Sequence, residues 1–149
     1  MDAEDFIAKW RANQRNEAAA SKEHFFDLCA LLGVLMPNSD PTGAEYAFEK
    51  GARKASGGAG WADVWKQGCF GWEYKSRGGD LAAAHDQLLR YAGALENPPL
   101  LIASDMERIF VRTNWTNQVT AQEEFSLADL RDDEILARLL ALNHARAGG

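Results

Sequence analysis

Residues 60–75 read Gly-Trp-Ala-Asp-Val-Trp-Lys-Gln-Gly-Cys-Phe-Gly-Trp-Glu-Tyr-Lys, and this stretch says more about the fold than any other part of the chain. Asp63 precedes Glu73 by ten positions, and Lys75 follows Glu73 by two. Because side chains alternate along a β-strand, Glu73 and Lys75 point to the same face. Roughly one chain in thirty of this length carries such a spacing by chance at ordinary residue frequencies, so the surrounding residues decide its value.

The neighbouring residues predict a β-hairpin. If residues 66–69 turn the chain around Gly68, Asp63 lies directly opposite Glu73. The same register gives two further pairs: Val64 with Trp72, and Ala62 with Tyr74. One face is then apolar: Ala62, Val64, Phe70, Trp72 and Tyr74. The sequence therefore predicts a half-buried hairpin whose other face gathers three ionisable side chains at one place.

Two directly opposed carboxylates have Cβ atoms about 4.5–5.5 Å apart and repel each other, so a divalent cation would turn the repulsion into binding. Mg²⁺ suits such a pair because it takes one or two carboxylates, keeps several waters and is completed by a phosphate. Lys75 adds a positive charge that could hold a phosphate or help to deprotonate a water. This layout is typical of a metal-dependent nuclease. The alternative is a solvated strand face on which Lys75 neutralises one acid, and the pattern alone leaves both interpretations open.

The charge balance bears on nucleic acid binding. The chain has 149 residues and a net charge of −6, whereas a domain that binds DNA by itself normally carries a basic surplus. Either the chain does not contact nucleic acid, or another part of a larger protein supplies the grip. The length fits a single domain over residues 1–149, large enough for a real core.

The composition predicts a cytoplasmic protein. No stretch approaches the length of a membrane span, and the N-terminus is acidic rather than signal-like. We expect the two cysteines, Cys29 and Cys69, to be reduced and structural. The three histidines show no metal-ligand spacing: His24, His85 and His144.

Apolar periodicity divides the chain into three regions. An N-terminal helical region covers residues 1–33 and stops at Gly33. A catalytic sheet and helix cover residues 45–113. A C-terminal helical region covers residues 126–146, is capped by Ser126 and buries three leucines: Leu136, Leu139 and Leu140.

The strands are expected at residues 45–54, in the hairpin, at 100–104 and at 109–113. Asp80 is the expected N-cap of a helix that runs to about Leu95, and the N-terminal helix is expected to break near residues 13–16. The order is helix, three strands, helix, two strands and helix. It predicts an α/β fold with a central mixed sheet flanked by helices.

Three stretches go further than the acid spacing: Phe48-Glu49-Lys50-Gly51, Gly60-Trp61-Ala62-Asp63-Val64-Trp65, and Glu73-Tyr74-Lys75-Ser76-Arg77-Gly78-Gly79-Asp80-Leu81 followed by Gln87 and Tyr91. Through them, residues from about 6 to 130 resemble the N-terminal nuclease domain of MmeI-like type IIL (type IIG) restriction-modification enzymes. The resemblance implies a restriction-endonuclease-like fold of the PD-(D/E)XK type. Ala62 stands in place of the proline that names this fold, and proline contributes no metal ligand.

The resemblance also implies roles for single residues. Asp63 and Glu73 would hold Mg²⁺, for which Mn²⁺ can substitute, together with the carbonyl oxygen of Tyr74. Lys75 would orient or activate the attacking water. Gln87 and Tyr91 match the helix motif that lies beside such sites in RecB-like nucleases, so Gln87 would be a catalytic residue and Tyr91 would contact DNA. Ser76 and Arg77 match the stretch just after the lysine and would also contact DNA.

In that family one long polypeptide joins the nuclease to a helical connector, an S-adenosylmethionine-dependent DNA adenine methyltransferase and a target-recognition domain. The sequence contains neither the cofactor-binding glycine loop nor the Asn-Pro-Pro-Tyr/Phe motif of such a methyltransferase, so S-adenosylmethionine would bind outside this chain. The implied partners are double-stranded DNA and the two missing domains. A double-strand cut would require two nuclease domains to meet, through dimerisation.

Several alternatives stay open. Nucleases of this fold often take another acid from the first helix, where Glu17 and Glu23 are the candidates, although each also suits a solvated helix position. Trp61 and Trp65 share a strand face with Asp63 and either pack or line a DNA groove. Two other classes of function remain: a catalytically inactive nuclease-fold interaction domain of a DNA methyltransferase, and a methyltransferase-associated protein whose activity lies wholly in a partner.

Overall fold

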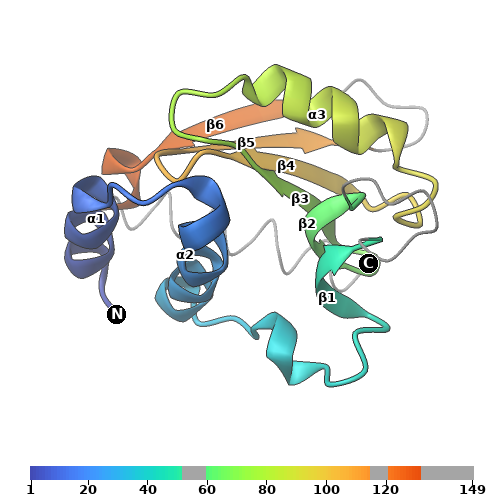
Figure 1. Ribbon diagram of the computed structural model, residues 1–149, viewed down its shortest axis with the longest axis horizontal. Helices are drawn as coiled ribbons and strands as arrows, with labels where there is room; N and C mark the ends of the chain where they lie inside the picture. Colours follow the sequence, from blue (N-terminus) through green and yellow to red (C-terminus); the bar gives the residue numbers. More distant parts are fainter. Residues whose placement is uncertain (52–59, 115–120, 132–149) are drawn as a thin grey trace.

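The computed structural model describes residues 1–51, 60–114 and 121–131. They form an α/β fold around a six-stranded mixed sheet (Figure 1). The strands lie side by side in chain order: β1 (Tyr46–Lys50), β2 (Ala62–Lys66), β3 (Phe70–Tyr74), β4 (Leu100–Ser104), β5 (Arg108–Thr113) and β6 (Gln122–Ser126). β3 and β4 are parallel, and the other neighbours are antiparallel. The predicted mixed sheet is therefore confirmed.

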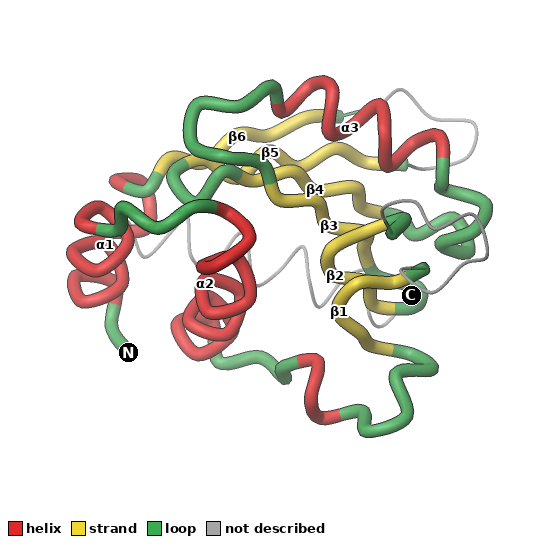
Figure 2. The backbone as a smooth tube through the Cα atoms, viewed as in Figure 1, coloured by secondary structure: helices red, strands yellow, loops and turns green. Residues whose placement is uncertain are grey.

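Within the described residues, three α-helices flank the sheet: α1 (Ala3–Ala12), α2 (Glu17–Leu32) and α3 (Leu81–Arg90). α3 covers one face, and α2, with α1 beside it, lies on the opposite side (Figure 2). Within the described ranges, no helix has the length and apolar character needed to cross a membrane.

The helix ends follow the signals in the sequence. Asn16 caps α2 by accepting a hydrogen bond from the N–H of Ala19, and this cap lies at the predicted break after α1. Gly33 ends α2 with a left-handed φ of 69°. Asp80 caps α3, also as predicted.

α3 is shorter than predicted. It ends at Arg90, and turns carry the chain to Glu96, whose φ of 63° is left-handed. Gly93 lies in this segment, and glycine disfavours a helix interior by roughly 0.5–1 kcal/mol relative to alanine. The apolar pattern therefore continues beyond the regular helix, and Leu95 is still fully buried.

The predicted hairpin is present between β2 and β3. Gly68 lies in its turn with a left-handed φ of 71°. Val64 pairs with Trp72, which confirms the expected register. The paired residues end at Val64 and Trp72, and beyond them Asp63 Oδ2 accepts a hydrogen bond from the main-chain N–H of Tyr74.

The prediction that this hairpin is half-buried, with Ala62 on its apolar face, was wrong. All five residues of β3 are buried, because α3 joins β3 to the parallel strand β4 and covers the second face of the sheet. Ala62 packs on that second face in a cluster with Trp65 and Leu88. Val64 and the aromatic side chains of β3 pack instead with residues of α2.

β1 is also shorter than predicted. It ends at Lys50, and Gly51 turns the chain with a φ of 82°. A Cβ at Gly51 would lie 2.5 Å from the ring of Trp61, so this turn has room for glycine only. Residues 52–54 of the predicted strand lie outside the described residues.

A strand that the sequence analysis did not predict, β6, comes just before the predicted C-terminal helical region. β6 ends at Ser126, whose N–H donates to the Asp129 carboxylate, and a 3₁₀ helix follows at Ala128–Arg131. β6 has one fully buried apolar residue, Phe125, and this gives too little periodicity to predict a strand. The remainder of the predicted helical region, with its three leucines, lies outside the described residues: Leu136, Leu139 and Leu140.

Candidate active site

Asp63 and Glu73 meet where β2 and β3 lie side by side. Asp63 Oδ2 accepts a hydrogen bond from the main-chain N–H of Tyr74 at 2.7 Å, and the charge of Asp63 acts on the nearby carboxyl group of Glu73. Glu73 is only 9% exposed. The structure thus brings together the two acids that the sequence singled out.

This environment favours a proton on the pair. Burial and, next, the charge of Asp63 raise the pKa of Glu73 from 4.5 to about 8. The pKa of Asp63 is raised as well, chiefly by burial, although the Tyr74 N–H favours its ionised form. Burial therefore favours a proton shared by the pair, because two adjacent carboxylates do not both ionise without a compensating cation.

Lys75 and Gln87 both lie close to the acid pair. Lys75 directly follows β3, and its main-chain N–H donates to the Ser104 carbonyl at 2.8 Å. Its charge lowers the pKa of each acid. Gln87 of α3 lies close enough to Glu73 to lower the pKa of its carboxyl group. Gln87, which the sequence analysis expects to support catalysis, therefore lies beside Glu73.

Glu17 also faces this site, whereas Glu23 does not. Burial and then the charge of Asp63 raise the pKa of Glu17. Glu17 and Asp63 both line a cavity of about 240 Å³ between α2 and strands β1 and β2. Glu23 instead forms ion pairs with Lys9 and Arg15. Of the two acids left open by the sequence, Glu17 is the one brought to the pair.

Glu49 is a further acidic residue of this cavity, and sequence reasoning did not assign it. It lines the cavity from β1, and its charge raises the pKa of Asp63. Its φ of 54° is left-handed, which is uncommon and strained for a residue other than glycine. Lys22 of α2 lies 3.6 Å from its carboxylate. No spacing in the sequence signals Glu49, because its part depends on a local backbone conformation.

Ser76 and Arg77, expected to contact DNA, lie in the turn after β3. Both residues are exposed. The Arg77 guanidinium donates to the Trp10 carbonyl at 3.1 Å and pairs with Glu107 at 3.6 Å. Arg77 therefore already links α1 to the loop between β4 and β5.

Tyr91, the third expected DNA contact, directly follows α3 and is partly buried, as is Trp61 before β2. Both pack against a cluster that contains Trp65. Trp65 is fully buried, and its indole N–H donates to the Leu95 carbonyl at 2.8 Å. Of the two tryptophans on the Asp63 strand, Trp65 is therefore a packing residue.

Asp105 organises the turn at residues 76–79, a role that no sequence motif indicated. Its buried carboxylate accepts hydrogen bonds from the main-chain N–H groups of Gly78 (3.1 Å), Glu107 (3.0 Å) and Arg108 (2.8 Å). The Arg108 guanidinium binds the same carboxylate and also a carbonyl of the turn. The position of the chain just after Lys75 therefore depends on Asp105.

The donor set fits a hard divalent cation. Asp63 and Glu73 supply carboxylate oxygens, Tyr74 can add a carbonyl, and Mg²⁺ completes such sets with waters and phosphate oxygens. Among the residues that the structure describes, no three or more His, Cys, Asp and Glu side chains form a group that could hold a metal ion by themselves. A cation here would therefore need ligands from solvent or from a bound phosphate.

The two histidines that the structure describes are buried side chains with neutral rings. His24 Nδ1 lies 2.9 Å from the Tyr74 hydroxyl, and His85 Nε2 lies 2.9 Å from the Phe110 carbonyl. Burial lowers the pKa of His24 to about 3 and that of His85 to about 4. His144 lies outside the described residues.

Acidification below pH 6.5 is expected to destabilise the protein. His24 and His85 regain the ordinary pKa of 6.5 on unfolding, so the unfolded state takes up two protons that the folded state excludes. Glu73 opposes this by holding one proton in the folded state, and the raised pKa values of Asp63 and Glu17 act in the same direction. Each histidine by itself lowers the free energy of unfolding by up to about 1.4 kcal/mol per pH unit between 6.5 and 4.5. Urea unfolding over this range measures it, and a stability that stays constant or rises would contradict the neutral burial of the histidines.

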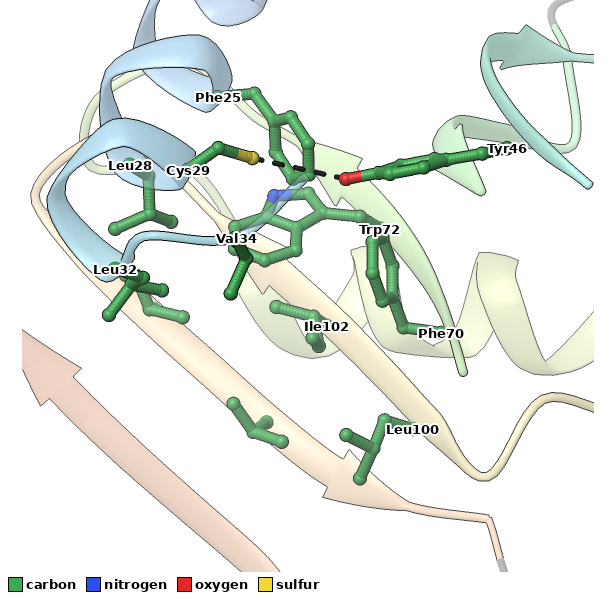
Figure 3. Close-up of a pocket in the computed structure, with 12 residues that line it drawn as sticks. Phe25, Leu28, Cys29, Leu32, Val34, Tyr46, Phe70, Trp72, Leu100 and Ile102 are labelled. Carbon is green, nitrogen blue, oxygen red and sulfur yellow. Dashed lines mark hydrogen bonds between the residues drawn. The ribbon is translucent and has the colours of Figure 1, made fainter. Parts of the chain in front are cut away.

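A second cavity, of about 70 Å³, lies between α2 and the sheet (Figure 3). Phe25 and Cys29 line it from α2, with Trp72 and Ile102 on the strands, and none of its lining residues is charged. It is a gap in core packing. Cys29 and Cys69 are both buried free thiols, which agrees with the prediction.

Comparison of the chain with protein-family models, curated proteins and solved structures finds no significant match in any of the three. Functional conclusions therefore depend on the fold and on the geometry around Asp63 and Glu73.

Proposed function

We propose that this chain is a Mg²⁺-dependent DNA endonuclease domain with a PD-(D/E)XK type of fold, part of a type IIG/IIL restriction-modification enzyme. The observation that carries the proposal is the acid pair, Asp63 and Glu73, held largely out of water beside Lys75. Strongly perturbed carboxyl groups with a specific charge partner are typical of functional sites. A cation bound by the pair would relieve the repulsion between the two carboxylates and would account for their burial.

The residues around the pair have distinct parts in this proposal. Asp63, Glu73 and the Tyr74 carbonyl would hold Mg²⁺, which would supply a lowered pKa for a bound water and neutralise charge on the scissile phosphate. The Tyr74 N–H orients Asp63, and Gln87 holds the Glu73 carboxylate. Lys75 orients the attacking water or the phosphate. No covalent intermediate is involved, because the pair binds metal and does not attack the substrate.

The net charge of −6 implies that most of the affinity for double-stranded DNA comes from other domains of the enzyme. We assign this DNA binding to the target-recognition and methyltransferase domains, the second of which would use S-adenosylmethionine. A double-strand cut would bring two nuclease domains together.

The test combines calorimetric titration of Mn²⁺ with nicking of a supercoiled plasmid. We expect the wild type to bind Mn²⁺ and, because the other domains that bind DNA are absent, to nick the plasmid only slowly and at low salt. Asp63→Asn should lose both properties. Lys75→Ala should keep Mn²⁺ binding but lose nicking by about 100-fold or more, because lysine is not a ligand. Glu23→Gln, whose ion pairs lie outside the cavity, is the matched control. Undiminished binding by Asp63→Asn, or full nicking by Lys75→Ala, would contradict the roles proposed for these two residues.

A catalytically inactive nuclease-fold interaction domain is the second candidate. It is favoured by the acidic net charge and by Arg77, which already binds Trp10 and Glu107. It predicts a folded wild type that neither binds Mn²⁺ nor nicks DNA in the same two assays.

A further inference from the structure

Tyr74 connects the candidate active site to the core on the α2 side of the sheet. Its main-chain N–H donates to Asp63 at 2.7 Å. Its side chain is 1% exposed, and its hydroxyl lies 2.9 Å from His24 Nδ1. One residue therefore contacts both the acid pair and α2.

His24 of α2 is surrounded by aromatic rings. Its ring lies 5.3 Å from that of Phe6, 4.9 Å from that of Trp10 and 5.5 Å from that of Tyr74, measured between ring centroids. The ring is almost completely buried. A hydrogen bond between two buried neutral groups is costly to break, because each partner is then left unsatisfied away from water.

The same helix carries Glu17 to the cavity shared with Asp63. His24 follows Glu17 by seven positions, which is about two turns of an α-helix, so both side chains lie on the same side of α2. The bond between His24 and Tyr74 therefore fixes α2 against β3 two turns from Glu17.

We propose that His24 and Tyr74 are positioning residues of the candidate metal site: their hydrogen bond sets the distance of Glu17 from the Asp63–Glu73 pair. Glu17 would then help to hold the cation from across the cavity. This inference rests on the proposed function, because it assumes that the acid pair binds a divalent cation.

The test compares two tyrosine variants by calorimetric titration of Mn²⁺. Tyr74→Phe removes the hydroxyl that binds His24 and is expected to weaken Mn²⁺ binding about tenfold, the usual effect of losing a residue that orients a metal ligand. Tyr46→Phe is the matched control, because Tyr46 is also buried and hydrogen bonded, to the Leu35 carbonyl, but does not line the Glu17 cavity. Equal Mn²⁺ affinities in the two variants would overturn the inference.

A double-mutant cycle separates positioning from general destabilisation. In a Glu17→Gln background, Tyr74→Phe is expected to change Mn²⁺ affinity less than twofold, since the residue it positions is already neutral. A full tenfold loss in that background would overturn the inference. His24→Leu breaks the same bond from α2 and is expected to repeat the result if Tyr74→Phe does not fold.

The outcomes also separate this inference from the proposed function. A wild type that binds no Mn²⁺ would overturn both. A wild type that binds Mn²⁺, loses it in Asp63→Asn and is indifferent to Tyr74→Phe would leave the metal site in place and overturn only the positioning role.

Discussion

Glu73→Gln is expected to stabilise the protein near pH 8, by on the order of 3 kcal/mol. Glu73 has a folded-state pKa of about 8 and an ordinary value of 4.5. The folded state thus holds an extra proton between these values, and stability is lost as pH rises through that window. Glutamine is close in shape, cannot ionise and can still donate to Asp63, so the loss is absent in the variant. Urea unfolding of both proteins near pH 5 and pH 8 gives the comparison.

The difference in free energy of unfolding between the two proteins should be small near pH 5 and large near pH 8. Added Mg²⁺ should reduce this difference by stabilising the wild type, because the cation favours the ionised pair and binds only the folded state. A variant no more stable than the wild type near pH 8 would show that Glu73 is already ionised there without cost. The gain in stability would come with loss of metal binding, as is common for groups retained for function.

Asp105→Ala is expected to have the largest destabilising effect, about 3–5 kcal/mol. The carboxylate is 1% exposed. Burial alone would raise its pKa, but hydrogen bonds from Arg108, Glu107 and Gly78 outweigh burial and lower it. The variant would leave these donors and the Arg108 guanidinium without their acceptor.

Asp80→Ala is the natural control for this substitution. Asp80 is exposed and caps α3 through a single hydrogen bond to the Ala83 N–H, a contact worth about 1 kcal/mol. Urea unfolding near neutral pH compares the two variants. If Asp105→Ala cost no more than Asp80→Ala, the turn at residues 76–79 would not depend on Asp105.

Local signals predicted the parts of the fold that local physics decides. The caps at Asp80 and Gly33 and the turn at Gly68 each depend on a few neighbouring residues, and the structure confirms all three. The register of β2 and β3 followed from the same alternation. For this reason the meeting of Asp63 and Glu73 could be predicted from the sequence.

Contacts between distant residues could not be predicted in this way. α3 packs over β3 and thereby buries the second face of the hairpin. The sequence of the hairpin itself does not indicate that a helix packs there. The bond between His24 and Tyr74 joins residues 50 positions apart. Glu17 and Glu23 lie on the same helix, and only the directions of their side chains show that Glu17 faces the cavity and Glu23 does not.

The agreement between strand order and chain order has a consequence for how the protein folds. The turn at Gly68 closes a short loop, and hairpins of this kind form in about 1–10 μs. α2 must instead find β3 across a much longer loop, whose closure costs more entropy. The repulsion between Asp63 and Glu73 therefore acts early, before α2 docks. Neutralising that repulsion, by protons or by a cation, is expected to raise the folding rate and not merely to slow unfolding.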